Sequence, residues 1–180
     1  DQRHNIVASF DYRYGSGKDY DGPVINNKQI LSNAGLNFVF RASSGRPYTR
    51  QSNVTPTADF TINTRSTLAG SINGSRKPWN FRIDAKFDKG FKIKTGTNAN
   101  GTRKTFALNA YIVVQNVFDT RNVLAVYAAT GSPDDDGYIN SPGAQNSIES
   151  QVSPQAYRDL YYAAELNPGN YSLPRRTRLG

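Results

Sequence analysis

The chain has 180 residues, no cysteine, no methionine and a formal net charge of +8. The missing cysteines exclude disulfides, thiol catalysis and thiolate metal sites, and no apolar run approaches the roughly 18 residues of a membrane-spanning helix. Because the positive charges are spread along the sequence, with no massed basic tract, we expect no nucleic-acid partner. The absence of methionine leads us to expect a processed chain or a fragment.

Four segments alternate apolar and polar residues one by one, which is typical of strands with one apolar face. They are His4–Tyr14, Leu31–Ser43, Trp79–Ile93 and Lys104–Tyr127, the last with an irregularity expected at Asn116–Asp119. The apolar residues occupy even positions in the first, second and fourth segments and odd positions in the third. We therefore predict four strands, each with one apolar and one polar face.

The connections between these strands differ in length and composition. An extended turn-rich segment covers 15–30, a short Gly/Asn/Thr turn covers 95–102, and two long loops cover 48–78 and 128–172. In the second long loop, Ser153 and Pro154 are typical of a helix start, and an apolar stripe follows at helical spacing. We predict one short helix there, and a further strand from about residue 176.

The predicted strands are longer than the usual 5 to 6 residues and match the roughly 9 to 11 that cross a bilayer. Aromatic residues gather near strand ends, as in the interfacial girdles of outer-membrane barrels. The fold class we predict is all-β: an antiparallel transmembrane β-barrel segment of four to five strands, with residues 1–180 as a single region. Since so few strands cannot close, we expect them to belong to a larger barrel.

This fold assigns the two faces of each strand to different surroundings. We expect the apolar face to contact lipid, through Ile6, Phe10, Phe38, Phe40, Phe81, Ile83, Phe87 and Ile112. We expect the polar face to line the lumen or dock a plug, through Arg82, Asp84, Lys86, Asp88, Asn109 and Gln115. The alternating signs on the third strand favour docking through salt bridges over selection of a charged solute.

Catalytic and metal-binding patterns are sparse. His4 is the single histidine, and Gly15–Lys18 lacks the Ser or Thr and the following helix that a phosphate loop requires. We therefore expect no enzymatic activity and no cofactor. Asp134, Asp135 and Asp136 are candidate calcium ligands by residue type alone, and a solvated acidic loop is the alternative.

Four short motifs stand in order along the chain. Asp1–His4 precedes the first strand, Asn116–Asp119 reads Asn-Val-Phe-Asp, residues 127–137 lie in the last loop, and Asn170–Gly180 enters the final strand. Together they resemble the C-terminal barrel part of TonB-dependent outer-membrane receptors, in the Oar-like branch that carries a carboxypeptidase-regulatory-like domain. The resemblance implies a large plugged barrel in the outer membrane of a Gram-negative bacterium, with loops 48–78 and 128–172 external.

The resemblance also implies import of a scarce solute, with outer-membrane lipid, the protein's own plug and TonB as partners. The plug, the TonB box and the terminal aromatic residue of the family are not among these residues, so we expect transport to belong to the parent protein. Two alternatives remain: an outer-membrane scaffold or subunit of a secretion or surface-lipoprotein complex, and a soluble β-sandwich module that binds glycans. Solubility of the folded protein without detergent would favour the sandwich.

Overall fold

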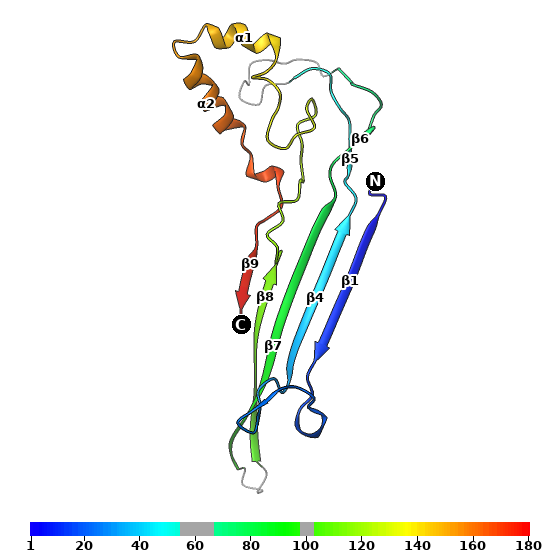
Figure 1. The fold of residues 1–180 in the computed structure, drawn as a ribbon, viewed down its shortest axis with the longest axis vertical. Helices are drawn as coiled ribbons and strands as arrows, with labels where there is room; N and C mark the ends of the chain where they lie inside the picture. The colour runs from blue at the N-terminus through cyan, green and yellow to red at the C-terminus, as the bar shows by residue number, and fades with distance from the viewer. Residues whose placement is uncertain (55–66, 98–102) are drawn as a thin grey trace. The chain divides into compact units, whose positions relative to one another are not determined.

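The computed structural model describes residues 1–54, 67–97 and 103–180. The fold is mostly β, with antiparallel sheets and two α-helices (Figure 1). The chain forms two compact units, which we describe separately. The sheet unit comprises 6–42, 81–120 and 174–180, and the loop unit comprises 1–5, 43–80 and 121–173.

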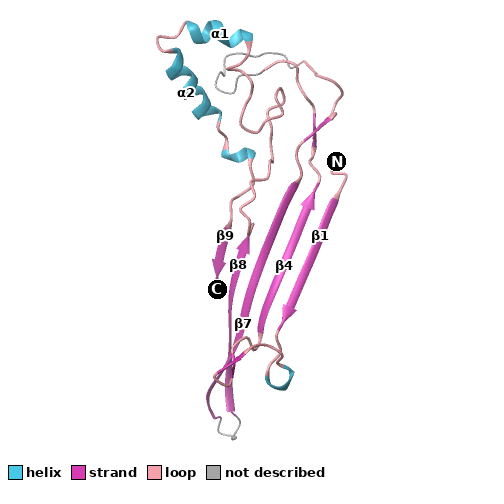
Figure 2. Ribbon diagram, viewed as in Figure 1, coloured by secondary structure: helices cyan, strands magenta, loops and turns pink. Residues whose placement is uncertain are grey.

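The sheet unit is built on a five-stranded sheet in the order β1-β4-β7-β8-β9, drawn as magenta arrows in Figure 2. Its strands are β1 (Asn5–Arg13), β4 (Ala34–Ser43), β7 (Asn80–Thr97), β8 (Arg103–Gln115) and β9 (Arg176–Leu179). Within the described residues, β1 and β9 are each paired on one side only, so the sheet is open. The prediction of an antiparallel β fold is thereby confirmed, without a closed barrel.

The register places the apolar residues of neighbouring strands on one face. Phe87 of β7 lies opposite Ile112 of β8, and Ile112 lies opposite Leu179 of β9. The neighbouring pair Asp88 and Tyr111 therefore belongs to the other face, because side chains alternate along a strand. Odd positions of β7 and even positions of β8 share a face, as the alternation predicts.

All predicted strands are present, but three of their ends differ clearly from the prediction. Strand β4 begins at Ala34, three residues later than expected, and β7 runs to Thr97, into the predicted turn 95–102. The fourth strand was expected to run to Tyr127, but β8 ends at Gln115. Asn116 and Asp119 adopt left-handed backbone conformations, with φ of 56° and 55°. Such residues break the extended ladder, and Asn and Asp tolerate this conformation better than other non-glycine residues.

The connection after β1 contains more structure than a plain loop. It forms a 3₁₀ turn, η1 (Gly17–Asp19), and a small hairpin of β2 (Val24–Ile25) and β3 (Lys28–Gln29). Asn26 and Asn27 both have positive φ, as a two-residue hairpin turn of type I′ requires.

The loop unit contains the short pair β5 (Pro47–Tyr48) and β6 (Ser75–Arg76), the helices α1 (Pro142–Glu149) and α2 (Pro154–Glu165), and η2 (Pro168–Asn170). Its hydrophobic core is formed by Ile139, Ala144, Ile148 and Tyr161. Parts of the predicted loop 48–78 and turn 95–102 lie outside the described residues.

The helix predicted after Ser153 is confirmed as α2, and the Ser153 side chain accepts a hydrogen bond from Ala156 N at 3.4 Å. The prediction of a single helix in this loop was wrong, because α1 precedes it. Helix α1 begins with Pro142 and Gly143, a pair that is more typical of a turn, and it buries only Ala144 and Ile148. Among the described residues, no helix is long and apolar enough to span a membrane.

Candidate functional site

The apolar face of the five-stranded sheet is exposed. Six of the eight residues that we predicted to face lipid are exposed on it, and Phe40 and Ile83 are half-buried. The exposed ones are Ile6, Phe10, Phe38, Phe81, Phe87 and Ile112. In the described part of the sheet unit, the only buried hydrophobic residues are Ala34 and Ala42. Within the described residues, this face therefore has no hydrophobic core of its own.

The polar face carries two groups of ion pairs, which together involve three strands. Asp84 of β7 contacts Arg41 of β4 at 2.8 Å and Arg82 at 2.7 Å. Asp88 of β7 contacts Arg13 of β1 at 2.9 Å, with Lys86 at 3.9 Å. Each carboxylate that we predicted on this face is therefore shared by two cations of the sheet itself.

Gly35 makes the contact between Arg13 and Asp88 possible. It lies on β4, between β1 and β7, and a Cβ built on it would lie 2.6 Å from Arg13 Nη2 and 3.2 Å from Asp88 Oδ1. A side chain at this position would occupy the space through which the guanidinium crosses β4. The absence of a side chain on the middle strand thus permits an ion pair between its two neighbours.

The remaining predicted lumen residues also lie in the sheet. Asn109 is opposite Gly90 in the β7–β8 register and borders a hollow of about 390 Å³ with Lys86, Asp88 and Lys92. Gln115 is half-buried and lies opposite Arg176 of β9. The sheet therefore brings all six predicted residues to one polar surface.

The Asn-Val-Phe-Asp motif, Asn116–Asp119, forms a tight turn that is hydrogen-bonded to this polar surface. Asn116 N donates to Asp84 Oδ1 at 2.9 Å, so the turn and two arginines share one carboxylate. The Asn116 side chain accepts from Thr120 N at 3.0 Å and donates to the Thr120 carbonyl at 3.1 Å. Asp119 Oδ1 accepts from Arg175 N at 2.7 Å, which ties the chain just before β9 to the end of β8.

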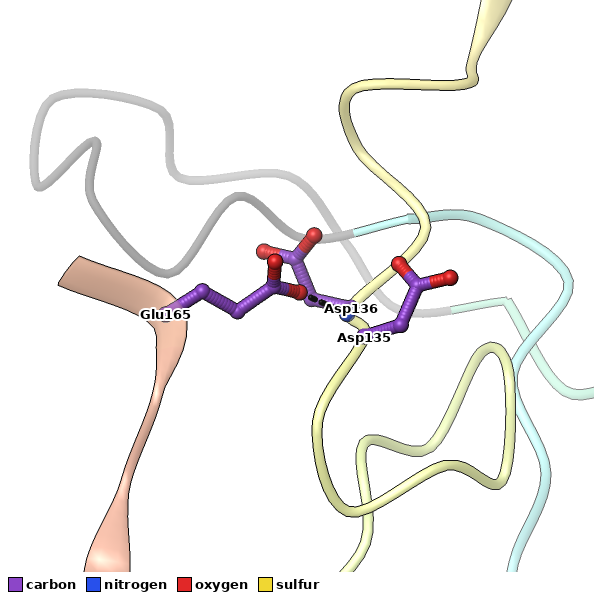
Figure 3. Close-up of side chains that lie close together, drawn as sticks. All are labelled: Asp135, Asp136 and Glu165. Atoms are coloured by element: carbon purple, nitrogen blue, oxygen red, sulfur yellow. Dashed lines mark hydrogen bonds between the residues drawn. The ribbon is translucent and has the colours of Figure 1, made fainter. Parts of the chain in front are cut away.

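A second cluster of functional groups lies in the loop unit. Asp135, Asp136 and Glu165 bring carboxylate oxygens within 4.8 Å of one another (Figure 3). Asp136 and Glu165 are almost fully buried. Asp136 Oδ2 accepts from the Tyr161 hydroxyl at 2.7 Å, and Glu165 Oε1 accepts from Asp136 N. These bonds attach the C-terminal end of α2 to the loop that contains both aspartates.

Burial of the Glu165 carboxyl raises its pKa to about 7, and the nearby charges of Asp136 and Asp135 act in the same direction. A protonated Glu165 relieves the repulsion among these carboxylates.

The candidate calcium ligands are separated by the fold. Asp135 and Asp136 join Glu165, whereas Asp134 accepts a hydrogen bond from the Tyr171 hydroxyl. Both oxygens of Asp136 already accept hydrogen bonds, Oδ1 from Tyr138 N at 2.8 Å. In this structure the cluster attaches α2 to the loop that contains the aspartates. Calcium binding at these residues remains a prediction.

Several members of these sites were not predicted from the sequence, namely Arg13, Gly35, Arg41 and Glu165. Gly35 had a signal, because a glycine inside a strand often marks a close approach of another group. No comparable sequence signal marked Glu165, since it lies 29 residues away from its partner Asp136. We compared the chain with protein-family models, curated proteins and solved structures, and none of them matches it.

Proposed function

We propose that this chain forms part of the wall of an outer-membrane barrel, and that the parent protein is a transporter of the TonB-dependent receptor type. The single observation that carries the proposal is the exposed apolar face of a sheet whose opposite face holds ion pairs. One face would contact lipid and the other a plugged lumen. The protein would import a scarce solute, with energy supplied through TonB.

Strand length supports this proposal. Strands β1, β4, β7 and β8 have 9, 10, 18 and 13 residues, and a tilted crossing needs roughly 9 to 11. Ordinary strands of globular proteins are about 5 to 6 residues long. Four adjacent strands thus match the thickness of a membrane, and the longer ones extend beyond it.

The order of the connections also supports it. In an antiparallel sheet of this order, connections 44–79 and 116–175 leave one end, and the β1–β4 and β7–β8 connections leave the other. Long connections at one end and shorter ones at the other are typical of bacterial barrels.

The exposed apolar side chains give the proposal an energetic basis. Each large side chain gains roughly 1.5–3 kcal/mol on full burial, and a dozen such residues on this face are about half exposed. Covering them is therefore worth on the order of 10 kcal/mol, which is comparable to the whole stability of a domain. Lipid would provide this cover without a second protein layer.

The test compares two neighbouring arginine substitutions on β4. Phe38→Arg places a charge on the apolar face, whereas Asn37→Arg places it on the polar face, where Asn37 Nδ2 already donates to Asp11 Oδ2 at 3.0 Å. A cation facing lipid near the bilayer midplane costs about 2–4 kcal/mol. We expect Phe38→Arg to lose the faster gel migration of the unboiled, folded protein and Asn37→Arg to keep it.

Two results would contradict the proposal. One is a folded monomer that is fully soluble without detergent, which would favour a soluble sandwich. The other is equal folding of Phe38→Arg and Asn37→Arg in membranes, because a charge on a lipid-facing side chain should impair folding and a charge on the polar face should not. To separate transport from scaffolding, deletion of the TonB box in the parent protein is expected to abolish solute uptake.

A further inference from the structure

A polar pocket of about 470 Å³ lies in the loop unit, apart from the clusters described above. Two of its lining residues are cations, Arg46 and Lys77, and no carboxylate of the described part of the chain lines it. Gln2, Ser43 and Asn80 add neutral polar groups. The pocket therefore has a positive charge and falls within the usual size range of small-molecule sites.

A close crossing of the backbone holds the two cations together. A Cβ built on Gly45 would lie 1.6 Å from the carbonyl oxygen of Lys77, so only glycine fits there. Lys77 N donates to the Arg46 carbonyl at 3.1 Å, and β5 and β6 continue the pairing with Pro47 opposite Arg76. The backbones of Arg46 and Lys77 are thus held next to each other, and both residues line the pocket.

Both cations keep hydrogen-bonding capacity for a ligand. Among the described residues, no carboxylate forms an ion pair with either of them. Lys77 Nζ donates to the Leu124 carbonyl, which leaves two of its three protons. The Arg46 guanidinium offers a planar pair of donors that matches a carboxylate.

Asn80 adds a neutral polar side chain to the lining of the pocket. Its Oδ1 is buried, and it accepts no hydrogen bond from the described residues. Buried acceptors without a donor are rare and costly in folded proteins. Asn80 lines the pocket together with Ser43 and Gln2, and such neutral polar side chains hydrogen-bond hydroxyls. The pocket therefore suits an anionic group and a hydroxyl on one small molecule.

We propose that this pocket binds a sugar acid, with the carboxylate on Arg46 and Lys77 and a hydroxyl on Asn80. The part that this binding plays in solute import rests on the proposed function, whereas the binding itself does not. Neutral sugars lack the group for the cations, and simple fatty acids lack the hydroxyl for Asn80.

The test is calorimetric titration of the folded full-length protein with D-glucuronate, D-glucose and propionate as probes. We expect saturable binding of glucuronate and at least about tenfold weaker binding of the other two, since each lacks one of the two interactions. Arg46→Gln is expected to weaken glucuronate binding by about tenfold or more. Asn80→Leu is expected to weaken glucuronate and leave propionate unchanged.

Lys18→Gln, which removes a positive charge in η1, is the matched control and is expected to bind like the unaltered protein. Three results would overturn the proposal: no saturation with glucuronate at millimolar concentration, equal affinity for propionate, or unchanged affinity in Arg46→Gln. Gel migration of the unboiled variants verifies that they are folded. If the protein proves soluble without detergent, the barrel proposal fails, but the same titration can be run in plain buffer. Failure of the proposed function is therefore distinguishable from failure of ligand binding.

Discussion

Substitution of Gly35 by alanine tests whether the ion pair across β4 stabilises the sheet. The new Cβ would lie 2.6 Å from Arg13 Nη2 and 2.8 Å from Arg13 Cζ, so the guanidinium must leave Asp88. Asp88 would then keep only Lys86, whose Nζ is 3.9 Å away. Because the Asp88 side chain is only 8% exposed, water replaces the lost partner poorly.

The expected loss follows from the exposure of the two partners. A hydrogen bond to a charged group contributes about 1.5–3 kcal/mol. The Arg13 side chain is 54% exposed, so solvent screening reduces this value. We expect Gly35→Ala to lower the free energy of unfolding by about 1–2 kcal/mol relative to a harmless glycine-to-alanine change.

Gly90→Ala provides that reference within the same sheet. A Cβ at Gly90 would meet Asn33 Cβ at 3.5 Å, an ordinary contact, and both substitutions reduce the flexibility of the unfolded chain alike. Urea unfolding of the protein in detergent measures the difference. In an Arg13→Gln background the difference should vanish. Equal stability of Gly35→Ala and Gly90→Ala would refute the reasoning.

Three further predictions concern the turn and the loop unit. Asn116→Ala should lower the free energy of unfolding by about 2–3 kcal/mol, because alanine is strained at φ 56° and cannot form the two hydrogen bonds to Thr120. Asn116→Gly removes the strain but not the lost bonds, so its free energy of unfolding, measured by the same urea titration, should fall by less. The raised pKa of Glu165 means that its stabilising, protonated form is fully present below pH about 4.5 and is lost as the pH rises through about 7. Glu165→Gln should therefore flatten the dependence of the loop unit's melting temperature on pH in this range, and an unchanged profile would contradict the role of Glu165. Ile148→Ala, in the core of the loop unit, should cost about 2–5 kcal/mol in that unit, as measured by hydrogen exchange, with Leu160→Ala on the exposed side of α2 as a nearly neutral control.

The faces of the strands could be predicted from the sequence, because alternation is a local property of each strand. Phe87 and Ile112 share a face in the structure, as their parities require. The helix after Ser153 was equally local, since its cap and its proline are adjacent. Helix α1 escaped prediction because Pro142 and Gly143 are more typical of turns.

Contacts between strands could not be predicted, because they depend on register. The pairing of Arg13 with Asp88 requires that β4 lies between β1 and β7 and that Gly35 stands between the two side chains. The fourth strand was expected to extend too far because its apolar pattern continues past Asn116, where the backbone turns. The Glu165 cluster could not be predicted either, because Asp136 and Glu165 are 29 residues apart in the sequence and no motif links them.

The most direct test of the central claim is a cysteine scan along β7 from Phe81 to Ile93. The chain has no cysteine of its own, so each introduced thiol is the only one in it. With spin labels on protein reconstituted in liposomes, we predict that odd positions collide with lipid-soluble oxygen and even positions with a water-soluble nickel chelate. Odd positions shielded from both reagents would contradict the account, because they would lie in a protein core.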